Sequence, residues 1–268
     1  MRLETIFTDS TPRIAADCLG AGPLVLFLHG IGGNRSNWRD QLPAFAERYF
    51  AVAWDARGYG LSGGYDGALD FADFSVDLER LLDQLKVEKA HLVGLSMGGR
   101  IAADFYFRSP NRVASLTLVD THSGFAALSP AQRKEYVNSR LAPLKAGKTV
   151  ADIAPVVADK LLGPNASADM RARLEASISS LRQDCYMKSV AATVEQDSVG
   201  DYSGIRVPTH VMVGEHDSLT TPAMCRQLAN QIKGAAYSII SSAGHLSNIE
   251  NPTAFNASAL GFIDSISD

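Results

Sequence analysis

Runs of consecutive apolar residues alternate along most of the chain with segments in which apolar residues recur at helical spacing. The apolar runs are Pro23–Leu28, Phe50–Trp54, His91–Leu95 and Val113–Val119. Runs of this kind are typical of strands buried on both faces of a parallel sheet. The intervening helices are expected at Asn34–Arg48, Phe71–Leu85 and Ser96–Arg108. The alternation predicts an α/β fold with a mostly parallel sheet, helices on both faces and right-handed crossovers.

The first residues follow a different pattern. Arg2–Asp9 and Arg13–Cys18 alternate loosely between apolar and polar positions, and a turn-forming Ser-Thr-Pro stretch separates them. This pattern predicts an antiparallel hairpin at an edge of the sheet.

A second departure lies between Thr121 and Tyr202, where no strand-like run occurs. Glycine and proline breaks divide this segment into four expected helices, at Pro130–Lys145, Val150–Leu162, Ala168–Leu181 and Asp184–Glu195. The alternation then resumes with the strand Thr209–Val213, the helix Thr221–Ile232, the strand Ala236–Ile240 and the helix Pro252–Ile266. We therefore predict a core domain from residues 1–120 and 203–268, with residues 121–202 inserted as a helical cap over the carboxyl ends of the strands.

Composition limits the class of protein. The 268 residues are 46% hydrophobic and 20% charged, enough for one large α/β domain with an insertion. A formal net charge of -4 gives no basic footprint for nucleic acid. The chain begins without the apolar run of a signal peptide and contains no stretch that would cross a bilayer, so the expected location is cytoplasmic, away from membranes. Oligomeric state is left open.

The three cysteines, Cys18, Cys185 and Cys225, are widely spaced and form no C-x-x-C pair. This spacing favours reduced structural thiols over a disulfide framework or a zinc site. We expect neither a metal nor a cofactor.

The strongest chemical signal is Gly94-Leu-Ser-Met-Gly98, between a predicted strand and a predicted helix. In the G-x-S-x-G turn, the glycines relieve crowding around a serine held at the end of a strand. A serine hydroxyl is a weak nucleophile, so it needs a histidine to take its proton and a carboxylate to orient that histidine. Ser96 is therefore the candidate nucleophile.

The expected partners follow later strands, because sites in open parallel sheets lie at the carboxyl ends of strands. Asp217 follows the strand Thr209–Val213, and His245 follows the strand Ala236–Ile240. The chain order Ser96, Asp217, His245 is the one given for α/β-hydrolases. Asp120 also ends a strand and is the alternative acid; otherwise it is a structural or supporting group.

These motifs, together with His29-Gly30, Asp55-x-Arg-Gly-x-Gly-x-Ser62 and Asn251-Pro252, make the chain resemble the α/β-hydrolase fold superfamily over nearly its whole length. The resemblance implies an eight-stranded sheet, a triad of Ser96, Asp217 and His245, and an oxyanion hole made by the backbone N–H groups of Ile31 and Met97. It also implies that Asp55 and Arg57 brace loops near the site.

The remaining polar residues are expected to be structural. His29 is expected to pin the oxyanion loop, His91 and His210 to lie in strands, and His216 to shape the loop of Asp217. His122 is a weaker candidate for a place in the pocket. Most basic residues of the insertion are expected on a solvated face, with one of them a candidate to bind a substrate carboxylate; they are Arg133, Lys134, Arg140, Lys145, Lys148, Lys160, Arg171, Arg173, Arg182 and Lys188.

Within the superfamily, the short oxyanion loop, Ser-Met-Gly-Gly and the tail Gly-His-Leu-Ser-Asn-Ile-Glu-Asn-Pro are most similar to 3-oxoadipate enol-lactonases and small carboxylesterases. We therefore expect a serine hydrolase that cleaves a small ester or lactone through an acyl-enzyme on Ser96. A carbon–carbon hydrolase of the meta-cleavage type is the alternative, although Leu95 and Leu246 stand where those enzymes usually have Asn and Trp. A non-catalytic ligand receptor on the same fold is the second alternative. Aspartate-based dehalogenases and epoxide hydrolases are disfavoured.

Overall fold

The computed structural model describes residues 1–196 and 199–267. The strands are β1 (Glu4–Phe7), β2 (Ala15–Gly20), β3 (Leu24–Leu28), β4 (Phe50–Trp54), β5 (Ala90–Leu95), β6 (Val113–Val119), β7 (Thr209–Gly214) and β8 (Ala236–Ile240). The α-helices are α1 (Leu42–Phe45), α2 (Ala72–Gln84), α3 (Met97–Arg108), α4 (Pro130–Lys145), α5 (Val150–Leu161), α6 (Ala168–Ser179), α7 (Gln183–Glu195), α8 (Pro222–Gln231), α9 (Ser247–Glu250) and α10 (Pro252–Ser267). Short 3-10 helices are η1 (Arg35–Trp38), η2 (Pro110–Arg112) and η3 (Tyr202–Gly204).

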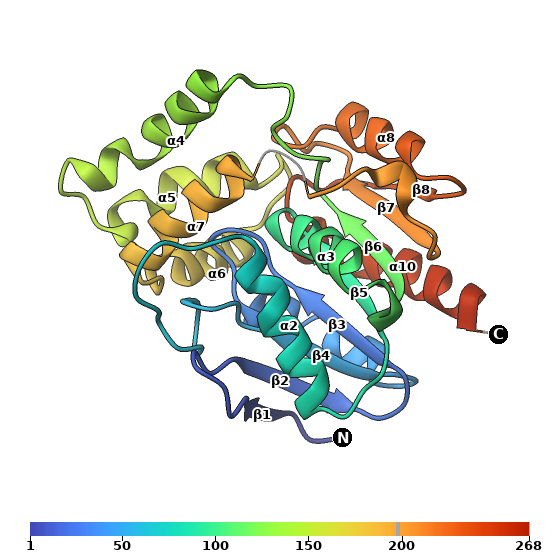
Figure 1. Ribbon diagram of the computed structural model, residues 1–268. Coiled ribbons are helices and arrows are strands. Elements are labelled where there is room, and N and C mark those ends of the chain that lie inside the picture. The colour runs from blue at the N-terminus through green and yellow to red at the C-terminus, as the bar shows by residue number, and fades with distance from the viewer. Residues whose placement is uncertain (197–198, 268) are drawn as a thin grey trace.

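The eight strands form one sheet in the order β1-β2-β4-β3-β5-β6-β7-β8 (Figure 1). β1 and β2 are an antiparallel hairpin, and β2 pairs antiparallel with β4; all other pairs are parallel. The predicted fold class and edge hairpin are confirmed. Every residue of β3, β5 and β7 is buried, which explains why these strands read as continuous apolar runs.

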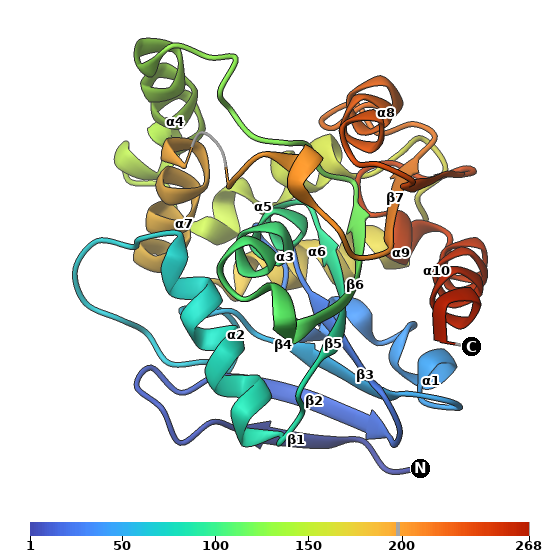
Figure 2. The same cartoon turned by 45° about the vertical axis from the view of Figure 1, so that its right-hand side comes forward.

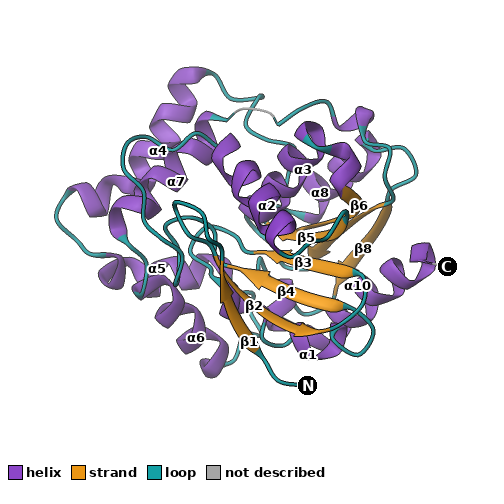
Figure 3. Cartoon of the chain, turned by 60° about the horizontal axis from the view of Figure 1, so that its bottom comes forward, coloured by secondary structure: helices purple, strands orange, loops and turns teal. Residues whose placement is uncertain are grey.

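Helices cover both faces of the sheet. Figure 2 shows α2 and α3 on one face and α1 and α10 on the other. The four helices α4 to α7 connect β6 to β7, and they gather where the parallel strands end (Figure 3). Ser96, Asp120 and Asp217 follow β5, β6 and β7 at that edge. The sheet therefore brings residues that are far apart in sequence to one place beneath the inserted helices.

The predicted helix over Asn34–Arg48 is wrong, because η1 and the short helix α1 occupy this segment with a turn between them. The Asn34 side chain accepts a hydrogen bond from the Ser36 amide and starts η1. Pro43 has no N–H to continue a hydrogen-bonded ladder, so it favours a new helix start. The apolar residues Trp38 and Phe45 are nevertheless buried, as their spacing suggested.

None of the helices in the described ranges combines the length and the apolar character that a transmembrane span requires.

Candidate active site

Ser96 lies in a tight turn between β5 and α3. Its backbone has φ 55° and ψ -115°, in the left-handed region that side-chain-bearing residues rarely adopt. The Ser96 amide donates to the Val119 carbonyl oxygen at 2.8 Å, which fixes the turn against β6. A Cβ atom at Gly94 or Gly98 would collide with backbone atoms, so only glycine allows this close approach. The turn holds the serine hydroxyl above the end of the sheet.

The three predicted triad residues lie in hydrogen-bonding contact. Ser96 Oγ lies 3.0 Å from His245 Nε2 and is placed to donate to it. On the other side of the ring, His245 Nδ1 donates to Asp217 Oδ2 at 2.8 Å. His245 and Asp217 are buried, and the histidine contacts Asp217 rather than the alternative acid Asp120. The arrangement has the geometry by which a histidine takes a proton from a hydroxyl.

The charges of His245 and Asp217 stabilise each other. Burial lowers the pKa of His245, but the hydrogen bond and negative charge of Asp217 outweigh burial, and the pKa lies above the usual value. Burial likewise opposes ionisation of Asp217, while the hydrogen bond from His245 holds its pKa below the usual range. An ionised Asp217 therefore stabilises the imidazolium that forms when His245 accepts a proton.

Two residues that sequence reasoning missed hold this pair in place. Thr220 Oγ1 donates to Asp217 Oδ2 at 2.6 Å, and the Thr220 amide donates to Asp217 Oδ1 at 3.0 Å. Glu250 accepts hydrogen bonds from the amides of Gly163, Gly244 and Leu246, at 2.7, 3.0 and 3.3 Å. Asp217 also accepts from the Leu219 amide at 2.8 Å, a turn that aspartate commonly forms with the backbone two residues on, and Thr220 follows directly after this turn. Glu250 acts across 87 residues to Gly163, a contact that local patterns do not reveal.

Asp120 lies close to Asp217 and ties three segments together. Its Oδ1 accepts from the Gly214 amide at 2.7 Å, and its Oδ2 accepts from the Ser247 hydroxyl at 2.6 Å. Burial, and then the charge of Asp217, raise the pKa of Asp120. Its negative charge in turn helps to raise the pKa of His245. Asp120 is thus a supporting group that joins β6 to the ends of β7 and of the His245 loop.

Replacing Asp120 by asparagine is expected to move the acidic limb of the kcat/KM profile to lower pH, by about one unit or less. The limb reports ionisation of His245, which must be neutral to accept a proton, and loss of a nearby negative charge lowers the pKa of that histidine. The measurement is kcat/KM against pH for wild type and Asp120→Asn on one ester. A midpoint that stays fixed or moves upward would contradict this role. Because the midpoint does not depend on the amount of active enzyme, a loss of folded protein in the variant would not change this conclusion.

The two residues predicted to form the oxyanion hole, Ile31 and Met97, line the same cavity as Ser96. Met97 begins α3, where the first N–H groups of a helix have no partner within it. Ile31 lies in the turn after β3, and it lines two cavities together with Ser96 and His245. Both amides belong to segments adjoining the serine, and their role in binding an oxyanion remains a prediction.

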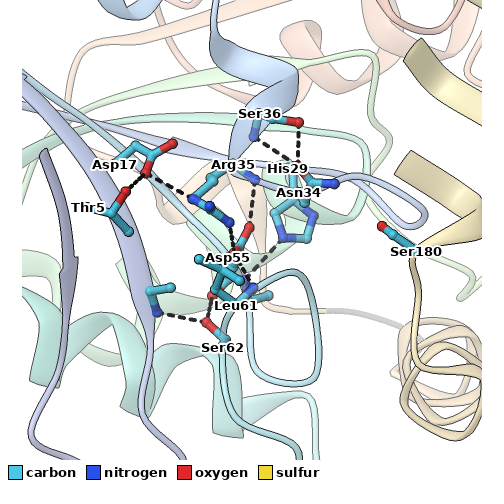
Figure 4. A network of polar contacts seen from close by, with 12 residues as sticks. Thr5, Asp17, His29, Asn34, Arg35, Ser36, Asp55, Leu61, Ser62 and Ser180 are labelled. Carbon is cyan, nitrogen blue, oxygen red and sulfur yellow. Dashed lines mark hydrogen bonds and ion pairs between the residues drawn. The ribbon is translucent and has the colours of Figure 1, made fainter. Parts of the chain in front are cut away.

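Figure 4 shows a network of polar contacts around His29, Arg35 and Asp55, and the segment between His29 and Arg35 contains Ile31. His29 Nε2 accepts from the Ala56 amide at 3.0 Å, so its Nδ1 carries the proton and donates to the Gly30 carbonyl oxygen at 2.9 Å. Asp55 binds the Arg35 guanidinium at 2.5 Å, and Arg35 also contacts Asp17 at 2.9 Å. The contacts agree with a structural role for His29 and Asp55.

Arg57 does not pair with Asp55. It binds Asp77 instead, at 2.6 Å from Nε and 2.9 Å from Nη2. Arg57 therefore fastens the loop after β4 to α2, away from the reacting groups. Asp55 and Arg57 therefore take part in two separate ion pairs, with Arg35 and with Asp77, rather than in one ion pair with each other.

The larger of two cavities beside Ser96 reaches beneath α4, α5 and α7. Arg100 lines it and is 1% exposed. It donates to the carbonyl oxygens of Thr193 and Gln196 and so ties α3 to the end of α7. His122 also lines this cavity, and burial lowers the pKa of its ring to about 4. His122 is therefore a neutral wall residue, while Arg100 is a contact that sequence reasoning missed.

The remaining histidines and the three cysteines line neither of the two cavities beside Ser96. His91 contacts Ser115 at 2.8 Å, and His210 contacts Ser238 at 2.9 Å, as expected for structural histidines. Cys18, Cys185 and Cys225 are buried free thiols. Among the described residues, histidine, cysteine, aspartate and glutamate form no group of three or more suited to a metal ion.

Comparisons with known proteins agree with this architecture. The family model of the α/β hydrolase fold matches residues 23–252. The 3-oxoadipate enol-lactonase 2 of Acinetobacter baylyi is 27% identical over 87% of this chain and 86% of its own. A putative carbamate hydrolase RutD of a Caulobacter species is 30% identical over 89% and 90% of the two chains. A hydrolase structure from Pseudomonas aeruginosa PA01 has a TM-score of 0.85 and 28% identity over 98% of both chains. Because the family model spans most of the sequence, this protein belongs to the α/β-hydrolase fold family.

Proposed function

We propose that the protein is a serine hydrolase that cleaves a small carboxylic ester or lactone. The observation that carries the proposal is the hydrogen-bonded line from Ser96 through His245 to Asp217, which ends beside a cavity large enough for a small molecule. The names of relatives, among them an enol-lactonase, support the same chemistry.

The proposed reaction has two steps. His245 Nε2 removes the proton from Ser96 Oγ, which attacks the ester carbonyl carbon, and the N–H groups of Ile31 and Met97 bind the resulting oxyanion. The tetrahedral intermediate collapses, His245 gives its proton to the leaving alcohol oxygen, and an acyl-enzyme remains. Water, activated by His245, then attacks the acyl carbon and releases the acid and free Ser96.

A substrate panel tests this function. We expect repeated turnover of 4-nitrophenyl esters and of an enol-lactone by wild-type protein, and little cleavage of a dienone-type carbon–carbon substrate. A ligand receptor would show at most one slow turnover per chain. Faster cleavage of the dienone than of every ester and lactone would instead identify a carbon–carbon hydrolase.

The approach to the site favours a substrate that carries a carboxylate. A groove between α4 and α5 shares Arg140, Val157 and Leu161 with the larger cavity, and Lys148 and Lys160 also line it. One acidic residue, Asp152, also lines the groove, and its carboxylate accepts hydrogen bonds from the Thr149 amide and hydroxyl at 2.7 and 2.8 Å. Arg140 lies over the Tyr136 ring at 4.5 Å, and no ion pair links it to a carboxylate of the described residues. The entrance is thus cationic, although the chain has a net charge of -4.

Replacing Arg140 by glutamine is expected to raise KM about tenfold or more for an ester that carries a carboxylate, because a charged hydrogen bond is lost. The same change should leave the matching methyl-capped ester within about twofold of wild type. Arg171 on α6 is the control: it pairs with Asp159 outside the two cavities, so Arg171→Gln should affect neither ester. An equal loss on both esters in Arg140→Gln would argue against carboxylate binding.

A further inference from the structure

The loop that carries His245 is held by hydrogen bonds from three successive backbone N–H groups. The Gly244 and Leu246 amides donate to Glu250 Oε1 at 3.0 and 3.3 Å. Between them, the His245 amide donates to the Leu161 carbonyl oxygen at 2.9 Å. His245 is 5% exposed, and a buried amide that lost its acceptor would be left unpaired. The backbone position of the histidine therefore depends on Glu250 and on the end of α5.

Glu250 reaches from this loop to the inserted helices. Its Oε2 accepts from the Gly163 amide at 2.7 Å, while its Oε1 serves the two amides of the loop. Gly163 lies in the connection between α5 and α6, residues 162–167, and is 87 residues from Glu250 along the chain. One carboxylate thus joins the α5–α6 connection to the loop of His245.

Gly163 and Gly244 bring the two backbones into direct contact. A Cβ atom added at Gly163 would lie 2.7 Å from the Gly244 nitrogen, and one added at Gly244 would overlap the Gly163 nitrogen. Only glycine at both positions leaves room for this approach. Because no gap separates the two segments, a shift of the α5–α6 connection displaces the loop of His245.

Leu161 extends this contact to the place where a substrate would lie. It lines both cavities beside Ser96, and its carbonyl oxygen binds the His245 amide. The residue that a bound substrate would meet at the end of α5 therefore also holds the backbone of the catalytic histidine.

We propose that Glu250 is a positioning residue that couples the inserted helices to the catalytic base. It holds the loop of His245 against the α5–α6 connection, in the position from which His245 Nε2 reaches Ser96 Oγ. The inference rests on the proposed hydrolysis at Ser96. A carboxylate suits this role because both of its oxygens accept hydrogen bonds, whereas glutamine has one acceptor and one donor group. Glutamine would turn its donor toward either the Gly163 amide or the loop amides, and the link would break on that side.

Glu250→Gln tests the proposal with a 4-nitrophenyl ester. The kcat is expressed per active site titrated to completion with a fluorophosphonate, so that unfolded chains do not count. We expect kcat per site to fall about tenfold or more, because small displacements of a proton-transferring group slow the reaction. KM should stay within about threefold of wild type. A merely structural residue would change the number of titrated sites but not kcat per site, and that result would overturn the proposal.

Glu215→Gln is the matched control. Glu215 Oε2 accepts from the Ser242 amide at 3.0 Å, three residues before His245, and the Glu215 side chain is 50% exposed. Glutamine keeps the single acceptor that this contact needs, although it removes the same negative charge. The control should therefore keep kcat per site within about twofold. An equal fall in both variants would trace the effect to lost charge and would also overturn the proposal.

Gly163→Ala tests the same link from the side of the inserted helices. The added Cβ would press against the Gly244 nitrogen and lie 3.0 Å from Glu250 Oε2, so kcat per site should again fall about tenfold. In the double variant with Glu250→Gln, the two losses should not multiply, because either change breaks the same link. A double variant whose kcat falls by the product of the two single effects would contradict the coupling.

The outcomes separate this inference from the proposed function. Wild-type turnover of esters, with kcat per site unchanged in Glu250→Gln, would overturn the coupling and leave the hydrolase in place. Absence of turnover on all esters and lactones would remove the proposed function, and the inference with it.

Discussion

Replacing Ser96 by alanine is expected to lower kcat on a 4-nitrophenyl ester by about 10⁶-fold, as loss of the nucleophile does in subtilisin. The hydroxyl is the atom that attacks the carbonyl carbon, and no other side-chain hydroxyl in the described residues is bonded to His245 Nε2. Without it His245 and Asp217 have no oxygen to activate. Residual hydrolysis would come from substrate binding and the backbone donors alone.

The kinetics of Ser96→Ala need a matched serine control. Ser115 is buried in β6 and bonds His91 at 2.8 Å, at a distance from the candidate site along the strand. Ser115→Ala should keep kcat within about twofold, although it loses one buried hydrogen bond and some stability. Ser96→Ala with more than a tenth of wild-type kcat would rule out the acyl-enzyme mechanism.

Replacing Gly98 by alanine is expected to destabilise the fold by at least about 3 kcal/mol and to abolish most activity. Gly98 lies in the first turn of α3, where an added Cβ would overlap the Leu28 carbonyl oxygen and lie 2.9 Å from the His29 carbonyl oxygen. These are backbone atoms, so relief requires α3 to move away from β3. That movement would also displace Ser96, which immediately precedes the helix.

Thermal unfolding followed by circular dichroism measures this effect, with an expected fall in Tm of roughly 6 to 12 °C. Gly261→Ala in α10 is the control, because nothing lies within 4 Å of its added Cβ. Alanine favours a helix interior over glycine, so this variant should unfold at or slightly above the wild-type temperature. Unfolding of Gly98→Ala within about 2 °C of wild type would show that the close packing of α3 against β3 at Gly98 does not limit stability.

Local patterns predicted the buried strands and the type of site because both depend on neighbouring residues. A strand such as Leu24–Leu28 is apolar throughout when both of its faces are covered, and its five-residue sequence alone shows this. Ser96, Asp217 and His245 were predicted because parallel strands deliver their following residues to one edge. Whether His245 contacts Asp217 or Asp120 depends on where two loops meet in space, which local sequence patterns do not reveal.

Residues that act at long range were missed. Glu250 clamps Gly163, and Asn248 bonds Gln41 across 207 residues; neither pair has a local signature. The error at Asn34–Arg48 had a different cause. Trp38, Leu42 and Phe45 have helical spacing and are buried, but the turn between η1 and α1 places them without a continuous helix. Periodicity therefore identified the buried face correctly and the backbone incorrectly.

Covalent labelling tests the central claim most directly. The wild-type protein is incubated with a fluorophosphonate, which forms a stable phosphonyl ester with an activated serine, and the adduct is located by intact mass and peptide mapping. We expect a single adduct per chain, on Ser96, and its loss in His245→Gln because the serine is no longer activated. An adduct on another residue, or continued ester turnover with Ser96 unmodified after full inhibition, would contradict the account.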